Sequence, residues 1–231
     1  MSYLRNEKGN AAIFLLWLLG IFTMVFLISI NIVKVYIVKE HASLSVDQAA
    51  LAGTAAIIER TKKAVEDFDE KETLDPLYIA DRASQRAASL GKSVGQLIEE
   101  KKNEYLNSGM DEADAYIKAV NKILPNHIHA HPFLKKEMRS NLGLSSSDAK
   151  YIYSPAVLDV IANNQGRTED TEPVLSTSEW RIEVKSTVRF ESITDNKFIS
   201  KFISDIPQKG YGPKLSYLEA VYTGTIVLPT P

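Results

Sequence analysis

Three histidines at alternating positions, His127, His129 and His131, are the residues of this chain best suited to chemistry. Imidazole is a common zinc ligand, and side chains two residues apart share one face of an extended segment, so three imidazoles could converge on one ion. However, prolines flank the segment, and it contains no acidic residue that would orient the imidazoles. We therefore interpret it as an exposed loop with incidental histidines, and a metal-dependent surface hydrolase is the least favoured hypothesis.

Other signs of catalysis are weak. The chain has no cysteine, which excludes thiol catalysis and disulfides, and it lacks a Gly-x-Ser-x-Gly elbow, a phosphate-binding glycine loop and a His-Glu-x-x-His motif. The acidic pairs Glu99-Glu100 and Asp111-Glu112 fall on predicted helix surfaces or first turns, where carboxylates complement the helix dipole. We expect no catalytic residue, no cofactor and no bound metal, so the chain is predicted not to be an enzyme.

An apolar segment near the N-terminus predicts a membrane anchor. Between Ala11 and Val33 only three side chains are clearly polar. A helix over this stretch is about 35 Å long, enough to cross a hydrocarbon core of roughly 30 Å. The apolar region of a cleaved signal peptide is only about 7–15 residues long. The segment from Lys34 to Glu40 continues it as an amphipathic stretch, so we interpret the whole as an uncleaved signal anchor.

These patterns divide the chain into a cytoplasmic leader (1–10), a transmembrane anchor (11–38), a helical extracytoplasmic region (39–145) and a strand-rich C-terminal region (146–231). Basic residues flank the anchor almost equally, but long following regions translocate largely regardless of charge. We expect a single-pass cell-membrane protein in contact with membrane lipid, with its C-terminal part outside the cytoplasm. The formal net charge of −2 gives no basic footprint for nucleic acid.

The first helix is predicted to run from about Asn10 to about Glu66. Beyond the anchor, Leu44, Leu51 and Ile58 recur every seven residues, which indicates a heptad seam. Gln48 and Ala55 occupy the intervening seam positions. Two pairs of small residues are four positions apart: Ala49 with Gly53, and Ala52 with Ala56. This spacing permits close approach between helices. Two partners are consistent with this small-residue stretch: the protein's own domain, or a helix of a neighbouring subunit.

Helix caps predict four more helices. Asp75 before a proline starts one over about 76–90, and Ser93 with Gln96 has capping-box spacing for another over about 93–106. A third spans about 111–124 and is expected to stop at Pro125. A short helix over about 132–141 is closed by Gly143.

The last part of the chain changes period. From Trp180 to Phe190, apolar side chains alternate with charged or polar ones, which predicts a half-buried strand with Ser186 as the one polar residue on its apolar side. A run rich in Val, Tyr and Thr over 217–228 predicts a second strand that pairs with the first, with a bulge at Gly224. We expect a turn at 194–196 and an exposed loop at 163–170. The fold class is α+β, with antiparallel C-terminal strands.

The N-terminal quarter resembles the TadE/TadG-like proteins of tight-adherence (Flp) pilus systems. The resemblance is carried by the short charged leader ending in Gly9, the apolar helix after it, and the sequence from Asp47 to Ala56 that reads Asp-Gln-Ala-Ala-Leu-Ala-Gly-Thr-Ala-Ala. Processed pilins and TadE-like pseudopilins carry a glutamate five residues after the processing glycine, and this chain has Phe14 there. The resemblance therefore implies the TadG-like type, an unprocessed membrane-anchored assembly protein.

From this resemblance we expect a membrane-anchored component of a tight-adherence, type IV-like pilus assembly or secretion apparatus. It would act by helix packing with pilus-assembly or pseudopilin subunits, and the sequence leaves a homo-oligomer open. The alternative from the residues alone is a membrane-anchored extracytoplasmic binding or sensing domain without a connection to pili.

Overall fold

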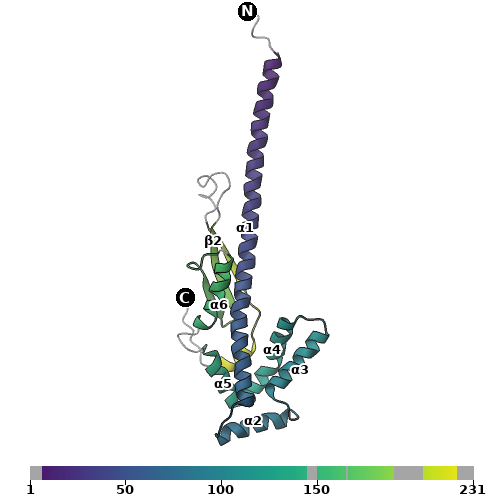
Figure 1. Cartoon of the computed structure of the whole chain (residues 1–231), viewed down its shortest axis with the longest axis vertical. Helices are drawn as coiled ribbons and strands as arrows, with labels where there is room; N and C mark the ends of the chain where they lie inside the picture. Colours follow the sequence, from purple (N-terminus) through teal and green to yellow (C-terminus); the bar gives the residue numbers. More distant parts are fainter. Residues whose placement is uncertain (1–6, 145–149, 165, 190–204, 223–231) are drawn as a thin grey trace, which may run out of the picture.

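One helix runs the length of the molecule. The computed structural model describes residues 7–144, 150–164, 166–189 and 205–222, and α1 (Glu7–Glu70) contains 64 of them. At 1.5 Å per residue this helix is about 96 Å long. Its upper part stands alone, and the other elements gather along its lower part (Figure 1). The predicted long first helix is confirmed, and it extends beyond both expected ends.

The burial pattern of α1 changes along its length. Every side chain from Ala11 to Ser29 is exposed, whereas farther along the helix one face is buried and includes Val46, Ile57 and Phe68. Full burial of a side chain such as Ile57 contributes about 1.5–3 kcal/mol. The elements with the most extensive contact with α1 are α3, α5, α6, β2 and β3. α1 is therefore the central support of the domain.

Four short helices follow α1, and three of the predicted caps are confirmed. Asp75 accepts a hydrogen bond from the backbone N–H of Leu77 at the start of α2 (Pro76–Ala88). Ser93 and Gln96 form the reciprocal capping box of α3 (Val94–Asn107). After α4 (Glu112–Ala130), α5 (Pro132–Leu142) ends at Gly143, whose φ of 58° is left-handed and suits glycine.

The expected helix stop at Pro125 is wrong, because α4 continues through this proline to Ala130. Proline removes one backbone hydrogen bond and crowds the preceding turn. Here the apolar face continues across it, with Leu124 and Ile128 both buried one turn apart. Packing of this face on the core outweighs the local cost of the proline.

A helix also occupies part of the region predicted to be rich in strands. α6 (Lys150–Asn163) contains Pro155 and several β-branched residues, so its local sequence is ambiguous. Its buried residues Tyr153, Val157 and Ile161 recur every four positions, which is a helical period. The loop that follows is mostly exposed, as predicted for 163–170.

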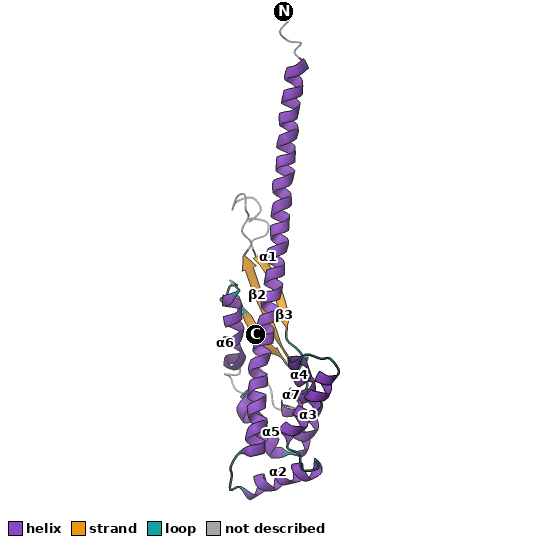
Figure 2. Cartoon of the chain, turned by 45° about the vertical axis from the view of Figure 1, so that its right-hand side comes forward, coloured by secondary structure: helices purple, strands orange, loops and turns teal. Residues whose placement is uncertain are grey.

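Three antiparallel strands form the sheet, in the order β1 (Glu172–Ser176), β2 (Arg181–Arg189) and β3 (Asp205–Tyr211). Figure 2 shows the sheet beside α1. The predicted strand β2 is confirmed in position, and Ile182, Val184 and Ser186 of its predicted apolar face are buried. Its polar residue Ser186 is buried and lies 2.9 Å from the hydroxyl of Thr171, so the polar interruption is hydrogen-bonded.

The predicted second strand is wrong over its described part. Residues 217–222 form a short helix, α7 (Tyr217–Tyr222), and β2 pairs with β1 and β3 instead. The β-type residues of α7 are buried side by side in the core, which overrides their local preference. The sequence did not predict β3, because this strand is largely polar and contains Pro207 and Gly210. Gly224 and the turn at 194–196 lie outside the described residues.

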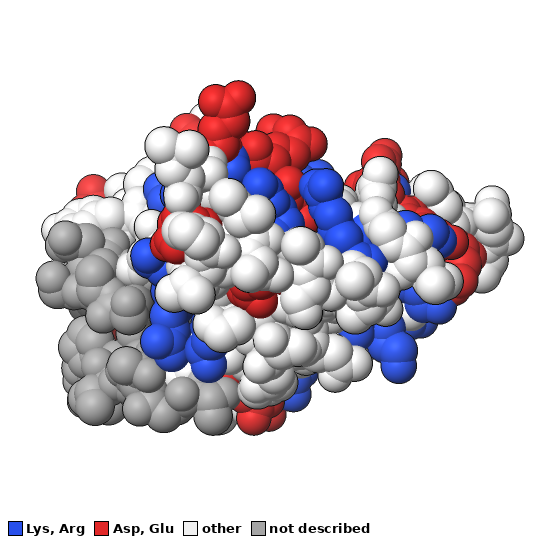
Figure 3. Space-filling model, turned by 90° about the horizontal axis from the view of Figure 1, so that it is seen from below, with Lys and Arg blue, Asp and Glu red and all other residues white. Residues whose placement is uncertain are grey.

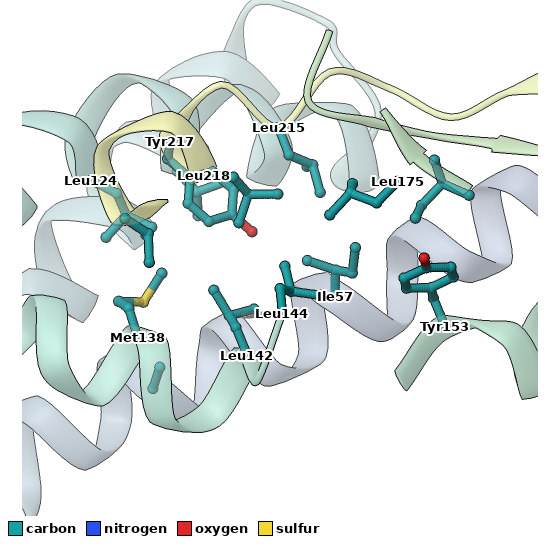
Figure 4. Packing of buried hydrophobic residues seen from close by; sticks show 14 of the residues in the cluster. Ile57, Leu124, Met138, Leu142, Leu144, Tyr153, Leu175, Leu215, Tyr217 and Leu218 are labelled. Atoms are coloured by element: carbon teal, nitrogen blue, oxygen red, sulfur yellow. The ribbon is translucent and has the colours of Figure 1, made fainter. Parts of the chain in front are cut away.

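The core joins both halves of the chain around Tyr217 (Figure 4). Thr61 of α1 donates its hydroxyl hydrogen to the carbonyl of Ile57, so the Tyr217 hydroxyl, 2.6 Å away, donates to Thr61 Oγ1. Complete burial raises the pKa of Tyr217 and keeps it neutral. This bond fixes α7 against α1 across 156 residues of sequence.

β3 approaches α1 closely because it carries glycine at the crossing. A Cβ atom at Gly210 would lie 2.2 Å from the backbone of Val46, and one at Gly53 would lie 2.9 Å from Val157 Cγ2. Backbone atoms cannot move aside as a flexible side chain can. Gly210 is therefore required by the packing of the sheet on the helix.

We predict that Gly210→Ala lowers the free energy of unfolding by about 1–3 kcal/mol or more, because the added methyl overlaps the backbone of α1. Urea unfolding of the full chain in detergent, followed by tryptophan fluorescence, measures this loss. Gly20→Ala is the matched control, since no atom lies within 4 Å of the position that its new Cβ would occupy. Equal stability of the two variants would contradict the assigned contact.

Candidate functional site

The histidine segment is helical, which corrects the expected exposed loop. His127 and His129 belong to the last turns of α4, and His131 lies at its junction with α5. Residues two apart on a helix point about 200° apart, so His129 faces away from the other two and is exposed. His127 and His131 stack with their ring centres 5.9 Å apart. The three imidazoles do not converge.

His131 has a partner that the sequence did not reveal. Its Nδ1 lies 2.8 Å from Oδ1 of Asp81 in α2, and the other oxygen of Asp81 accepts the backbone N–H of Phe133 at 3.0 Å. Asp81 lies 50 residues from His131 in sequence, so no local pattern connects them. Among the described residues no group of three His, Asp or Glu side chains could hold a metal ion. The Asp81–His131 pair attaches α2 to α5.

The end of α1 is held by the same group of helices. Its last carbonyls accept hydrogen bonds from α2: Tyr78 donates to Asp67 O at 3.1 Å, and Arg86 donates to Asp69 O at 3.0 Å. The Asp69 carboxylate accepts the backbone N–H groups of Val94 and Gly95 at the start of α3. These bonds satisfy groups that a helix end leaves unpaired, so they are structural.

Burial controls the electrostatics of the stacked pair. The pKa of His127 is lowered from its ordinary value of 6.5, first by burial and then by the neighbouring His131, while Asp69 acts in the opposite direction. His127 is therefore neutral at pH 7. Protonation of His127 at lower pH places a charge in this half-buried position at the junction of α4 and α5.

The two acidic pairs have structural roles. Asp111 is the N-cap of α4 and accepts the N–H groups of Ala113 and Asp114. Glu99 and Glu112 both pair with Lys102, and Glu100 pairs with Lys92 at 2.6 Å. These hydrogen bonds and ion pairs account for the four carboxylates as parts of helix starts and helix surfaces.

An open groove of about 900 Å³ lies along the lower part of α1. Both signs of charge line it, and its lining includes Glu59, Lys63, Glu66, Glu70, Asn141 of α5 and Ile152 of α6. The lower end of the molecule also carries acidic and basic side chains on one face (Figure 3). This distribution suits polar partners and offers no field of a single sign.

The small residues of α1 pack mainly on the protein's own domain. Ala49 is fully buried, and Gly53 lies against Val157 of α6 and Ile182 of β2. Ala52 and Ala56 are half-buried. For Ala49 and Gly53, the packing partner in the described structure is therefore the protein's own domain.

The heptad seam, in contrast, faces outward. Leu44 and Leu51 are 50% and 52% exposed, Gln48 and Ala55 are exposed, and Ile58 is half-buried. Ile37, seven residues before Leu44, is 52% exposed on the same face. The seam predicted from the sequence does not include it, because Ile37 falls within the predicted anchor. We call Ile37, Leu44, Leu51 and Ala55 the α1 stripe.

The upper part of α1 is long and apolar enough to span a membrane, judged on the described residues. Its three polar side chains are satisfied within the helix: Thr23, Ser29 and Asn31 each donate to the carbonyl four residues earlier at 2.8–2.9 Å. A polar group without a partner is costly in hydrocarbon, so these bonds suit a lipid environment. Phe14 is 66% exposed on this part of the helix.

We predict that the full chain binds no zinc stoichiometrically, since His129 points away from the stacked His127 and His131. Isothermal titration of the detergent-solubilised protein with a zinc salt measures this. One-to-one binding that disappears in His129→Ala would contradict the prediction, and because His129 is exposed, that variant keeps the fold.

We predict that the free energy of unfolding falls as the pH drops below about 6.5, since the unfolded chain then binds a proton at His127 that the folded chain binds only at lower pH. Urea unfolding at a series of pH values measures the slope. His127→Gln should reduce it, whereas the exposed control His129→Gln should not. The same slope in both variants would assign the effect to other groups.

Comparison of the chain with protein-family models, with curated proteins and with solved structures finds no match. A functional conclusion therefore depends on the residues and their geometry: an apolar helix of membrane length, a domain built on its lower part, and an exposed apolar stripe between them.

Proposed function

We propose that this protein is a membrane-anchored component of a tight-adherence, type IV-like pilus assembly or secretion apparatus. Its N-terminal segment spans the cell membrane once, and the domain beyond it lies outside the cytoplasm. It acts by helix packing with partner subunits and performs no covalent chemistry. The resemblance of its first quarter to TadG-like proteins supports the assignment to this apparatus. The α1 stripe is the proposed contact surface for partner subunits.

The continuity of α1 is the observation that carries this proposal. One helix leaves the apolar segment and becomes the central support of the domain without a break. A flexible linker would let the domain move independently of the membrane. A continuous helix instead holds the domain and the α1 stripe at a fixed height above the bilayer, where other membrane-anchored subunits meet them.

The stripe supports a packing role because it is apolar, exposed and regular. Seven-residue spacing keeps side chains on one face of a helix, and this is the pattern of helices that pair. The small-residue stretch, in contrast, stabilises the protein's own fold at Ala49 and Gly53. A partner therefore contacts the leucines, and substitution of the small residues would damage the domain itself.

The alternative is an anchored binding or sensing domain unconnected with pili. The charged groove along α1, α5 and α6 favours it, because an open groove of about 900 Å³ offers room for a polar ligand. The hydrolase hypothesis has less support, since His129 faces away from the stacked pair His127 and His131.

Affinity purification of the tagged full-length protein from its own cells tests the proposal. We predict that pilus-assembly proteins co-purify with it and are lost in the double variant Leu44→Asp/Leu51→Asp, because a buried charge breaks an apolar helix contact. Quantitative mass spectrometry of the eluate is the measurement.

The double variant Leu77→Asp/Leu90→Asp is the matched control. Its leucines are 71% and 94% exposed on and beside α2, far from the stripe, so both double variants add the same charge to exposed sites. Loss of partners in the control alone would move the contact to α2. A wild-type eluate without any pilus-assembly protein would refute the proposed apparatus.

A further inference from the structure

The α1 stripe lies on the exposed face of α1, opposite the face that the domain buries. From Ile37 to Ala55 it is about 27 Å long. The sheet and α6 pack on the other side of α1, and α3 and α4 stand beside the helix only farther down (Figure 1). The stripe ends where the face becomes charged, at Glu59 and Lys62, and the ammonium of Lys62 lies 4.4 Å from the centre of the Tyr116 ring of α4.

We propose that the stripe pairs with the stripe of a second copy of this chain, as a short parallel two-stranded coiled coil just above the membrane. The membrane anchor argues for this occupant. Two copies with identical spans in one bilayer have parallel α1 helices at the same height, so each stripe residue meets itself. This inference rests on the membrane anchoring in the proposed function and is independent of the pilus apparatus. It makes a second copy the direct partner of the stripe, so that any pilus-assembly subunit binds the paired helices.

Heptad positions agree with two strands. Ile37, Leu44 and Leu51 take the d positions. Leucine, present at two of the three, is the residue found at d in parallel dimers. The a positions between them are His41, Gln48 and Ala55. A polar residue at an a position fixes register and strand number at a cost in stability. Such a short coil depends on the anchor, which holds the two copies at high effective concentration.

Charge at the edge of the stripe also fits a second copy. Glu40 precedes the polar layer at His41, and both side chains are exposed. In a parallel in-register pair, the residue before an a position flanks the partner's a side chain, so Glu40 lies beside the histidine at position 41 of the second copy. Symmetry forms this carboxylate–imidazole contact twice. The e positions opposite the acidic Glu40 and Asp47 are Ser45 and Ala52, so no like charges meet.

Disulfide crosslinking tests the pairing, and the absence of natural cysteines makes every introduced thiol unique. Ile37→Cys, Leu44→Cys and Leu51→Cys are expressed as full chains in a host membrane that lacks pilus proteins and are mildly oxidised. Each should give a band at twice the chain mass. Adding Leu44→Asp and Leu51→Asp to Ile37→Cys should reduce that band several-fold.

Lys39→Cys is the matched control. Lys39 is exposed at the same height as Ile37 but points about 200° away from it, so it should give no dimer. Equal crosslinking at Lys39 and Ile37, crosslinks only to another protein, or no dimer at any stripe position would overturn the pairing. Dimers without pilus partners in native cells would leave the pairing intact and refute only the apparatus.

Discussion

The burial of one face of α1 is the interaction on which the rest of the described structure depends. α3, α5, α6, β2 and β3 contact this helix extensively, and every other described element contacts at least one of these five. The buried face runs from Val46 to Phe68, and nothing else in the described residues could replace it as a common support. Loss of this face would leave the short helices and the three-stranded sheet without a shared core.

The same helix has two kinds of surface. From Ala11 to Ser29 its side chains are exposed on all sides, and Thr23 and Ser29 donate hydrogen bonds back to their own helix, which suits a lipid environment. Farther along, one face is buried, and polar contacts with α2, α3 and α5 fix its end. Because the transition needs no loop, the apolar segment and the domain form one mechanical unit. The α1 stripe lies at this transition, which gives it a defined height and direction.

Polar contacts between distant residues complete the assembly. Asp81 with His131, Asp69 with the start of α3, and Tyr217 with Thr61 each join elements that are far apart in sequence. Each is buried or half-buried, where an unpaired polar group would be costly. They select one arrangement of helices that apolar packing alone would specify less strictly.

Local signals predicted much of the fold. The long apolar helix, the caps at Asp75 and Ser93, the glycine at position 143 and the strand β2 depend on near neighbours, and the structure confirms them. Prediction was wrong where tertiary packing outweighs local preference: at Pro125 inside α4, in α6, and in α7, whose β-type residues are buried as a helix. β3 was not predicted because its sequence is largely polar and contains Pro207 and Gly210. Gly210 is needed only for the close approach to α1, which the sequence does not reveal.

For the α1 stripe and the histidines, too, local signals were predictable and tertiary contacts were not. The sequence alone determined that a membrane-length helix leads into a heptad seam with Leu44 and Leu51, since periodicity is a property of neighbours along the chain. Only the tertiary structure decided that Ala49 and Gly53 face the domain while Leu44 and Leu51 face outward, because this depends on where the sheet and α6 pack. It also separated the three histidines and gave His131 its partner Asp81, a contact between residues that no sequence spacing relates.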